Sequence, residues 1–357
     1  RGLGDVYKRQ LRRWHGSSLL YGIVSLLVVA NTINIAADLA AMADALMLIV
    51  DGSHTVWVVL FGTVSVLLQV FIPYLRYVRV LKWLTLTLFA YVGTVFAEQI
   101  EWEKALISLL MPELQLNAAY LTTLVAIFGT TISPYMFFWQ ASQEVEELKA
   151  DPSARALRHA PEQARAHLRR IAIDNWIGMG LSNLIAFFIM LTTAATLFRH
   201  GITDIQSSRD AALALKPIAG EFAFLLFALG IIGTGMLAIP VLAGSAAYAV
   251  AGAFDWRTGL DLPLGLGWRF YGIIAVSTLI GAGIGISEID PMHALYWAAV
   301  INGIVSVPIM VVMMRMASRR DVMGPFVVTR RLKWMGWAAT AVMAGAVVLM
   351  LALSIRK

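Results

Sequence analysis

The sequence contains no cysteine among its 357 residues. Disulfides, zinc sites built on thiolates and thiol nucleophiles are therefore excluded. Charge is also scarce, because only 14% of the residues are Asp, Glu, Lys or Arg, against roughly 25% in a soluble domain. The few charged residues are clustered and leave long uncharged runs between them. This pattern is not that of a soluble globular domain.

Hydrophobic residues are abundant instead, at 59% of the chain, and the mean hydropathy is +0.74. A helix that crosses the hydrocarbon core needs about 20 apolar residues, whereas a barrel strand uses about 10. The sequence has runs of helical length at residues 17–49, 54–73, 77–98, 117–141, 171–197, 218–252, 267–287, 291–316 and 333–354. We therefore expect an all-α polytopic membrane protein with about nine spans.

The basic residues predict which side of the membrane each connection faces. Cytoplasmic connections are enriched in Lys and Arg, and alternate connections between the apolar runs carry most of these residues. They are Arg12, Arg13, Arg76, Arg79, Lys82, Lys149, Arg155, Arg158, Arg165, Arg169, Arg170, Arg257, Arg269, Arg315, Arg319, Arg320, Arg330, Arg331 and Lys333. The first span therefore begins on the cytoplasmic side, and the C-terminus is expected outside. The same distribution accounts for the net charge of +6 without a nucleic-acid partner.

The sequence lacks the motifs that several functional classes of protein need. No GxxxxGK[ST] loop is present, so the sequence does not encode a nucleotide-driven pump. All six histidines lie in connections or near the ends of apolar runs, which argues against an intramembrane enzyme with paired His or Asp residues inside its spans. We expect no enzyme activity, no cofactor, no nucleotide and no nucleic acid, with the lipid bilayer as the surrounding partner.

The first ten residues, RGLGDVYKRQ, differ from the rest of the chain. They contain no apolar run, and they begin with Arg rather than Met. We interpret residues 1–10 as a non-native scar and leave them out of the fold prediction. The alternative is a genuine cytoplasmic segment. In either case we expect the natural protein to extend further upstream.

One span is interrupted at its centre by the sequence GTTISP. Pro134 lacks an N–H and clashes with the carbonyl four residues earlier, and apolar residues resume after it. Secondary transporters place such breaks at the substrate site, where unwound backbone frees carbonyls that coordinate cations. A simple proline kink is the alternative, but the cluster of Gly129, Thr130, Thr131 and Ser133 favours a binding site.

Four stretches of the sequence resemble a known family. They are NTINIAADLAAMADAL, YVRVLKWLTLTLFAYV, TTISPYMFFWQASQEVEE and GIIGTGMLAIPVLAGSAAYA. The chain resembles the Nramp family of divalent metal transporters, and most closely its Nramp-related branch, which is associated with magnesium and manganese. The resemblance implies a LeuT-type fold of two inverted five-helix repeats that lacks its first two helices. The spans present would then be family helices 3 to 11.

This resemblance divides the rest of the chain into three parts. Residues 11–116 would hold the remainder of the first repeat, family helices 3 to 5, with an outer loop. Residues 117–316 would form the second repeat, helices 6 to 10, and residues 317–357 a cytoplasmic loop with an additional C-terminal helix. The helix with the family's Asp-Pro metal motif would lie upstream, so we expect the chain alone to bind divalent cations weakly.

The resemblance also implies which residues meet the metal. Typical members carry Met-Pro-His at the break of the sixth helix, and the Met sulfur and a carbonyl three residues earlier are ligands. By that match Ser133 replaces the Met, Tyr135 replaces the His, and Thr130 supplies the carbonyl. Ser306 matches a polar position of the ligand shell. A hard hydroxyl in place of a soft thioether favours a partly hydrated cation such as magnesium; alternatively, Ser133 only caps the second half-helix.

The polar residues expected along the transport path are Asn34, Asp38, Thr131 and Pro134. Asp38 lies in mid-span, where a carboxylate is costly and marks a functional site, and it matches an acid that the family uses for proton movement. The family's second acid corresponds to Ala41, and its His corresponds to Tyr135, so we expect weak or no proton coupling. Asn31 and Asn34 share one helix face, and we expect them to form hydrogen bonds with neighbouring helices.

The sequence therefore predicts a permease for hard divalent cations, magnesium or manganese, in a bacterial inner membrane, and we expect it to act as a monomer. Two alternatives stay open: a proton-coupled transporter of manganese or iron, and a transporter of another small solute on the same fold. The run QEVEE after the break is either a solvated helix end or an acidic vestibule that concentrates cations.

Overall fold

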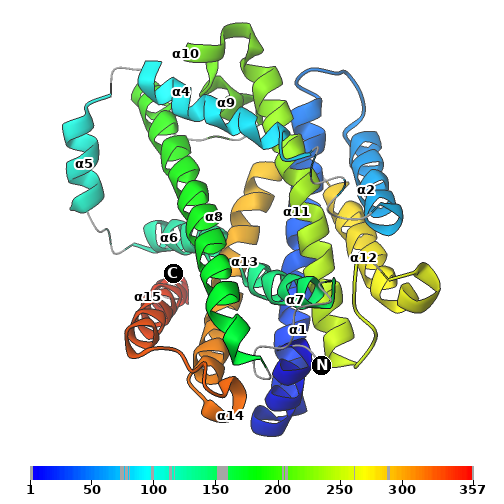
Figure 1. The fold of residues 1–357 in the computed structure, drawn as a ribbon. Coiled ribbons are helices and arrows are strands. Elements are labelled where there is room, and N and C mark those ends of the chain that lie inside the picture. Colours follow the sequence, from blue (N-terminus) through cyan, green and yellow to red (C-terminus); the bar gives the residue numbers. More distant parts are fainter. Residues whose placement is uncertain are drawn as a thin grey trace.

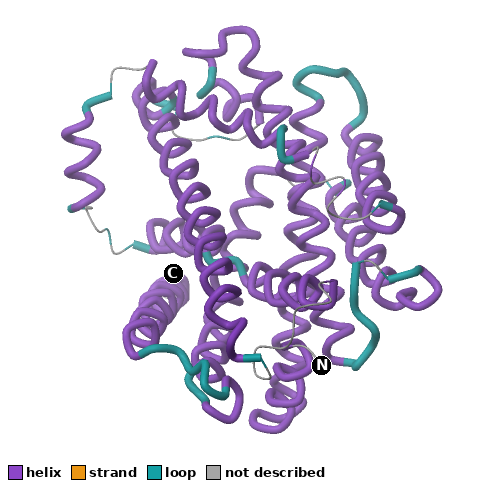
Figure 2. Tube along the Cα trace, in the orientation of Figure 1, coloured by secondary structure: helices purple, strands orange, loops and turns teal. Residues whose placement is uncertain are grey.

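The computed structural model describes residues 3–72, 76, 79, 81–97, 100–111, 115, 117–150, 160–202, 205, 208–260, 262–287 and 290–355. Within these residues the regular structure is entirely helical (Figure 2). The longer helices are α1 (Leu3–Leu46), α2 (His54–Phe71), α6 (Ala118–Thr131), α7 (Pro134–Ala150), α8 (Pro161–Thr196), α11 (Ala223–Ala253), α12 (Leu264–Gly285), α13 (Pro291–Ala317) and α15 (Arg330–Ile355). The shorter ones are η1 (Leu84–Leu88), α4 (Phe89–Ala97), α5 (Trp102–Leu110), η2 (Phe198–His200), α9 (Ser208–Leu213), α10 (Lys216–Ala219), η3 (Gly220–Phe222) and α14 (Arg320–Met323).

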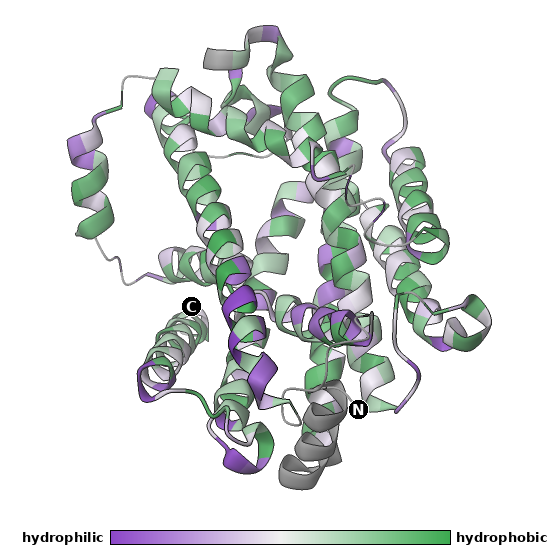
Figure 3. Cartoon of the chain, viewed as in Figure 1, coloured by the Kyte–Doolittle hydropathy of each residue, from purple (hydrophilic) through white to green (hydrophobic). Residues whose placement is uncertain are grey.

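Eight helical segments of the described residues are long and apolar enough to cross a membrane. They are Ser18–Leu46, His54–Phe71, Ala118–Lys149, Pro161–His200, Gly220–Ala253, Leu264–Gly285, Pro291–Ala317 and Arg330–Ile355. Apolar residues dominate these helices, while hydrophilic residues gather at the start of α8, along α7 and around α14 (Figure 3). The chain is therefore an integral membrane protein, as its composition predicts.

The range 77–98, which the sequence predicts as a further span, has a shorter apolar helix instead, at Leu84–Ala97. It begins as the 3-10 turn η1, where the Thr87 hydroxyl donates to the Leu84 carbonyl at 2.7 Å. Such local bonds compete with α-helical pairing and tighten the backbone. The next turns, in α4, pack against α8, and the Thr192 hydroxyl donates to the Tyr91 carbonyl. Positions 77, 78 and 80 lie outside the described residues.

The ends of several helices gather on two opposite sides of the bundle (Figure 1). Lys82, which the charge pattern groups with the cytoplasmic connections, leads instead into η1, which packs against the early part of α11. One side carries the early part of α1, the start of α8, the connection from α11 to α12, and α14 (Figure 1). The other side carries the connection from α1 to α2, together with α9 and α10 (Figure 1). The first side holds most of the Lys and Arg residues of the sequence, so it is the cytoplasmic side by the positive-inside rule.

Helix α1 lies at the centre of the bundle and packs against α11, α12 and α13. Its buried side chains Ile35 and Met42 join the largest core cluster. Two glycines let the partner helices approach closely: a Cβ on Gly281 would lie 2.7 Å from Ile35 Cγ2, and one on Gly235 would lie 2.4 Å from Met42 Sδ. Small residues at such crossings are typical of membrane helix packing. This packing directs the polar residues of α1 toward α11 and α13.

Candidate cation site at a helix break

The predicted break separates α6 from α7. Helix α6 ends at Thr131, Ile132 and Ser133 are not helical, and α7 begins at Pro134 (Figures 1 and 2). Proline suits the first position of a helix because the N–H that it lacks would have no partner there. Proline alone does not break a span in this protein, since α11 and α13 continue through Pro240 and Pro308.

The break leaves backbone carbonyls without their helical partners. The Thr130 carbonyl would normally accept from the N–H of residue 134, which is proline. The Ser133 hydroxyl lies 2.9 Å from the Gly129 carbonyl oxygen and 3.0 Å from that of Thr130. A hydroxyl has one hydrogen to donate, so it satisfies only one of these carbonyls at a time. The other carbonyl oxygen and the Ser133 lone pairs are then available to a further donor or to a cation.

Burial separates the predicted residues of the break into two groups. Ser133 is only 3% exposed, and Pro134 is also buried. The side chains of Thr130 and Thr131 are exposed, and their hydroxyls donate to the Ile127 carbonyl at 2.8 and 3.0 Å. Of these four residues, only Ser133 and Pro134 therefore face the interior of the protein. Thr131 turns its hydroxyl back onto its own helix, which satisfies that group without a ligand.

Helix α13 crosses α6 directly beside the break. A Cβ on Gly129 would lie 2.0 Å from the Ala299 carbonyl oxygen and 2.6 Å from the Gly303 nitrogen. A Cβ on Gly303 would in turn lie 2.7 Å from the Val125 carbonyl oxygen. All three distances are shorter than real Cβ contacts, so backbone meets backbone at this crossing. This pair is not evident from the sequence, because spacing within one helix does not reveal which small residues of two helices face each other.

The two asparagines of α1 bind neighbouring helices, as the sequence predicts. Asn31 Nδ2 donates to the Leu242 carbonyl at 2.9 Å and to Ser245 Oγ at 2.7 Å, both in α11. Asn34 and Asn302 of α13 exchange two side-chain hydrogen bonds of 3.1 Å. A polar residue in an apolar span signals such pairing, but the partner could be identified only in the structure.

Asp38 lies one turn beyond Asn34 on the same face of α1. Its side chain is partly buried, and among the described residues no hydrogen bond or ion pair reaches its carboxylate. The Tyr135 hydroxyl at the start of α7 lies within electrostatic range of both Asp38 and Ser133. Ala41, where the family resemblance implies a second acid, is buried. The structure therefore brings Asp38, Tyr135 and the break together.

Ser306 is fully buried on α13, one turn after Asn302. Its hydroxyl donates to the Gly303 carbonyl of its own helix at 2.8 Å. Within the described part of the chain no hydrogen bond joins Ser306 to Ser133. Ser306 thus lies on the helix that crosses the break, but its side chain serves its own helix.

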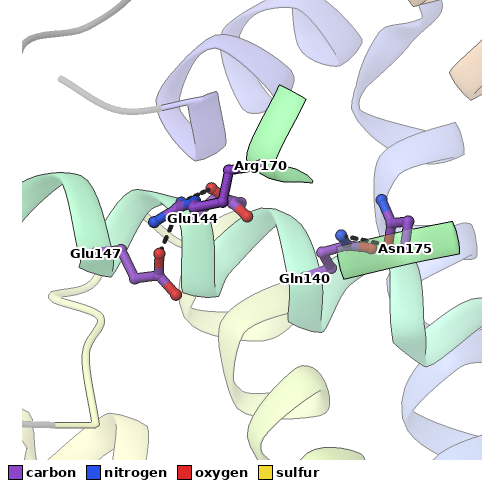
Figure 4. Close-up of polar contacts among 5 residues, drawn as sticks. All are labelled: Gln140, Glu144, Glu147, Arg170 and Asn175. Carbon is purple, nitrogen blue, oxygen red and sulfur yellow. Dashed lines mark hydrogen bonds and ion pairs between the residues drawn. The ribbon is translucent and has the colours of Figure 1, made fainter. Parts of the chain in front are cut away.

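The acidic residues after the break form ion pairs with the next helix. Arg170 of α8 lies between Glu144 and Glu147 of α7, at 2.9 and 2.8 Å (Figure 4). One turn toward the break, Gln140 Nε2 donates to Asn175 Oδ1 at 2.8 Å (Figure 4). The run QEVEE is therefore tied to α8 by ion pairs, in which Arg170 and Glu147 stay 45% and 56% exposed.

The atoms near the break that could coordinate a cation are therefore oxygens. They belong to two carbonyls, the Ser133 hydroxyl, and the nearby Tyr135 hydroxyl and Asp38 carboxylate. The described residues contain no group of three or more His, Cys, Asp or Glu side chains that could hold a metal. The candidate site therefore consists of oxygen atoms, with Asp38 as its nearby carboxylate.

Bacterial transporters of known sequence are similar to this chain. A divalent metal cation transporter, MntH, of Clostridium acetobutylicum is 25% identical over 249 residues, which cover 70% of this chain and 53% of that protein. The MntH of Deinococcus radiodurans is 26% identical over 229 residues, covering 63% and 47% respectively. The chain thus spans about half the length of these relatives.

Solved structures show the same fold. Crystal structures of single-residue mutants of a manganese transporter of Eremococcus coleocola superpose with a TM-score of 0.72 at 17% identity. They match 98% of this chain and 75% of the transporter. The model of the family described as natural resistance-associated macrophage protein-like (Nramp) matches residues 1–353. The fold, the break in α6–α7 and this match over nearly the whole chain agree, and the chain belongs to the Nramp family.

Proposed function

We propose that the protein is a permease of the plasma membrane that carries hard divalent cations, magnesium or manganese, with weak or no proton coupling. The observation that carries the proposal is the break itself. Ser133, at the position where typical family members have a thioether, is buried beside two carbonyls that the break leaves short of donors. Hard cations prefer such oxygen donors, whereas a thioether favours softer transition metals.

In this proposal Thr130 offers its carbonyl, Ser133 its hydroxyl, and Tyr135 and Ser306 are weaker candidates in the surrounding shell. Asp38, Asn34, Thr131 and Pro134 would lie along the path. The Asp38 carboxylate adds a negative charge that attracts a cation toward the break. The membrane potential then supplies the driving force, since moving two charges across 100 mV is worth about 4.6 kcal/mol.

A proton-coupled transporter of manganese or iron is the second candidate, and one observation favours it. Asp38 has no hydrogen-bond or ion-pair partner among the described residues, so its carboxyl is free to take up and release a proton. Ala41 and Tyr135 argue against strong coupling, because neither replaces the acid and the histidine that the resemblance implies.

The test is uptake by the protein expressed from its whole coding sequence and reconstituted in proteoliposomes that contain a pH-sensitive dye. We expect uptake of magnesium and manganese that follows the membrane potential, with no internal acidification. Rapid acidification in step with manganese uptake, together with no magnesium uptake, would establish the second candidate instead. Uptake of neither ion at any potential or pH gradient would refute cation transport.

A further inference from the structure

Helix α7 carries Ser133 and Tyr135 at or beside its start, but it is disconnected from α6 by the two non-helical residues at the break. Its position must therefore be set by contacts elsewhere along its length. One contact is the packing of Trp139 against Gly244 of α11, where a Cβ on the glycine would lie 2.5 Å from the indole ring. Phe137 and Phe138 pack against a cluster of α1 and α13, and further contacts involve carboxylates near the end of α7.

Glu146 is the carboxylate that faces α11. The Tyr248 hydroxyl of α11 donates to Glu146 Oε1, and the Leu260 backbone N–H donates to the same oxygen at 3.2 Å. Leu260 belongs to the connection between α11 and α12. A Cβ on the buried Gly259 would lie 3.3 Å from Glu146 Oε1, so this connection approaches the carboxylate through backbone.

The same connection is tied to α12 by a second tyrosine. The Tyr271 hydroxyl lies 2.7 Å from the Leu260 carbonyl oxygen and 3.1 Å from that of Leu262. Tyr248 and Tyr271 are 7% and 5% exposed, so both hydroxyls are shielded from competing water. One carboxylate thus joins α7, α11 and the connection to α12 on the cytoplasmic side.

We propose that Glu146 is a positioning residue: with Tyr248 and the Leu260 N–H it forms a latch that holds α7 in place and keeps the break, including Ser133, closed from the cytoplasm. The opposite side of α7 has the Arg170 pairs with Glu144 and Glu147 (Figure 4). Arg170 and Glu147 are 45% and 56% exposed there, and exposed ion pairs contribute little. Releasing the latch therefore opens the break, while loss of Arg170 has a smaller effect. This role rests on the proposed function, in which the break is the cation site.

The test uses the absence of cysteine from the chain. Ser133→Cys is introduced as a single buried thiol, and its modification by a small thiol reagent from the cytoplasmic side reports opening of the break. We expect Glu146→Ala to speed this modification about tenfold. Glu146→Gln should change it less than threefold, because the amide oxygen still accepts from Tyr248 and Leu260. Glu162→Ala, at the exposed start of α8, is the matched control and should leave the rate unchanged.

Tyr248→Phe is a milder variant that distinguishes loss of the latch from misfolding, because it removes one hydrogen-bond donor and keeps the aromatic ring. It should give an intermediate increase in a protein that elutes as a single species. Equal modification rates in Glu146→Ala, Tyr248→Phe and the parent would overturn the latch. The modification rate does not depend on transport, which is measured separately in the protein that retains Ser133. Faster modification in Glu146→Ala would support the latch even if that protein carried neither magnesium nor manganese. The absence of transport would then refute only the proposed function.

Discussion

At the residue scale, the chemistry of the break depends on which atoms the backbone leaves unpaired. Pro134 removes the donor that Thr130 would have used, and Ser133 supplies one hydrogen for two carbonyls. Pro240 and Pro308 directly follow Ile239 and Val307 rather than a hydroxyl residue, and the helix continues through both. The effect of a proline in a span is therefore decided by whether neighbouring side chains can take over the freed backbone groups.

The substitution Ser133→Met tests the ligand at this position. It adds a soft sulfur and fills the space that a hydrated magnesium ion would need. We expect magnesium uptake to fall and cadmium to compete better, with a change in relative affinity of about tenfold, equivalent to ~1.4 kcal/mol. Proteoliposome uptake with each ion measures this, and Ser133→Ala separates loss of the hydroxyl from gain of sulfur. Magnesium transport that stays unchanged in Ser133→Met would mean that this side chain does not face the ion.

The substitution Asp38→Asn tests the charge beside the break. It keeps the size of the side chain but removes the negative charge that would attract a divalent cation. We expect manganese uptake at low ion concentration to fall at least about tenfold, a loss of ~1.4 kcal/mol. Asp174→Asn, at an exposed position of α8, is the control and should have no effect. Normal uptake by Asp38→Asn would remove this residue from the transport path.

At the element scale, the helices follow from the apolar runs, and their starts follow from local chemistry. Asn117 caps α6 by accepting from the Tyr120 N–H, and Asp290 caps α13 by accepting from the Met292 N–H. Both are side chains that favour this position. The exception is α4, where apolar length alone predicts a span but threonine hydroxyls and packing on α8 produce a shorter helix.

The position of the break was predictable because its cause is local. Glycine, proline and small hydroxyl residues lie next to one another in the sequence, so their effect needs no knowledge of the fold. The partners of the site were not predictable in the same way. Asn34 meets Asn302 across 268 positions of the chain, and Glu146 meets Tyr248 across 102, so only the packing of the helices brings them together.

The crossing of α6 and α13 gives a test at this scale. Gly129→Ala would place a methyl group against the Ala299 backbone, and the helices must separate to admit it. We expect a cost of about 1–3 kcal/mol, seen as a lower melting temperature in detergent. Gly178→Ala is the control, because nothing lies within 4 Å of its Cβ position, and alanine should favour the helix there. Equal melting temperatures for the two variants would contradict this close crossing.

At the scale of the whole molecule, the two sides of the bundle can be mapped directly in the cysteine-free chain. Ser53→Cys and Ser287→Cys lie in exposed connections on the outer side, and Thr329→Cys lies in the connection before α15 on the cytoplasmic side. In intact spheroplasts a membrane-impermeant maleimide should modify the first two and spare the third until the membrane is opened. Modification of Thr329→Cys in sealed spheroplasts would reverse the orientation.

The two halves of the broken helix have different main neighbours, although α7 also touches α13 through the cluster that Phe137 and Phe138 join. Leu121, Val125 and Ala126 of α6 form a cluster with α13 and with Ala346 and Met350 of α15, whereas Trp139 of α7 joins the cluster of α1, α11 and α12. In genetic terms, suppressors of a damaging mutation in α6 should map to α13 and α15. Those of a mutation in α7 should map mainly to α11 and α1, although the two starting mutations lie only a few positions apart.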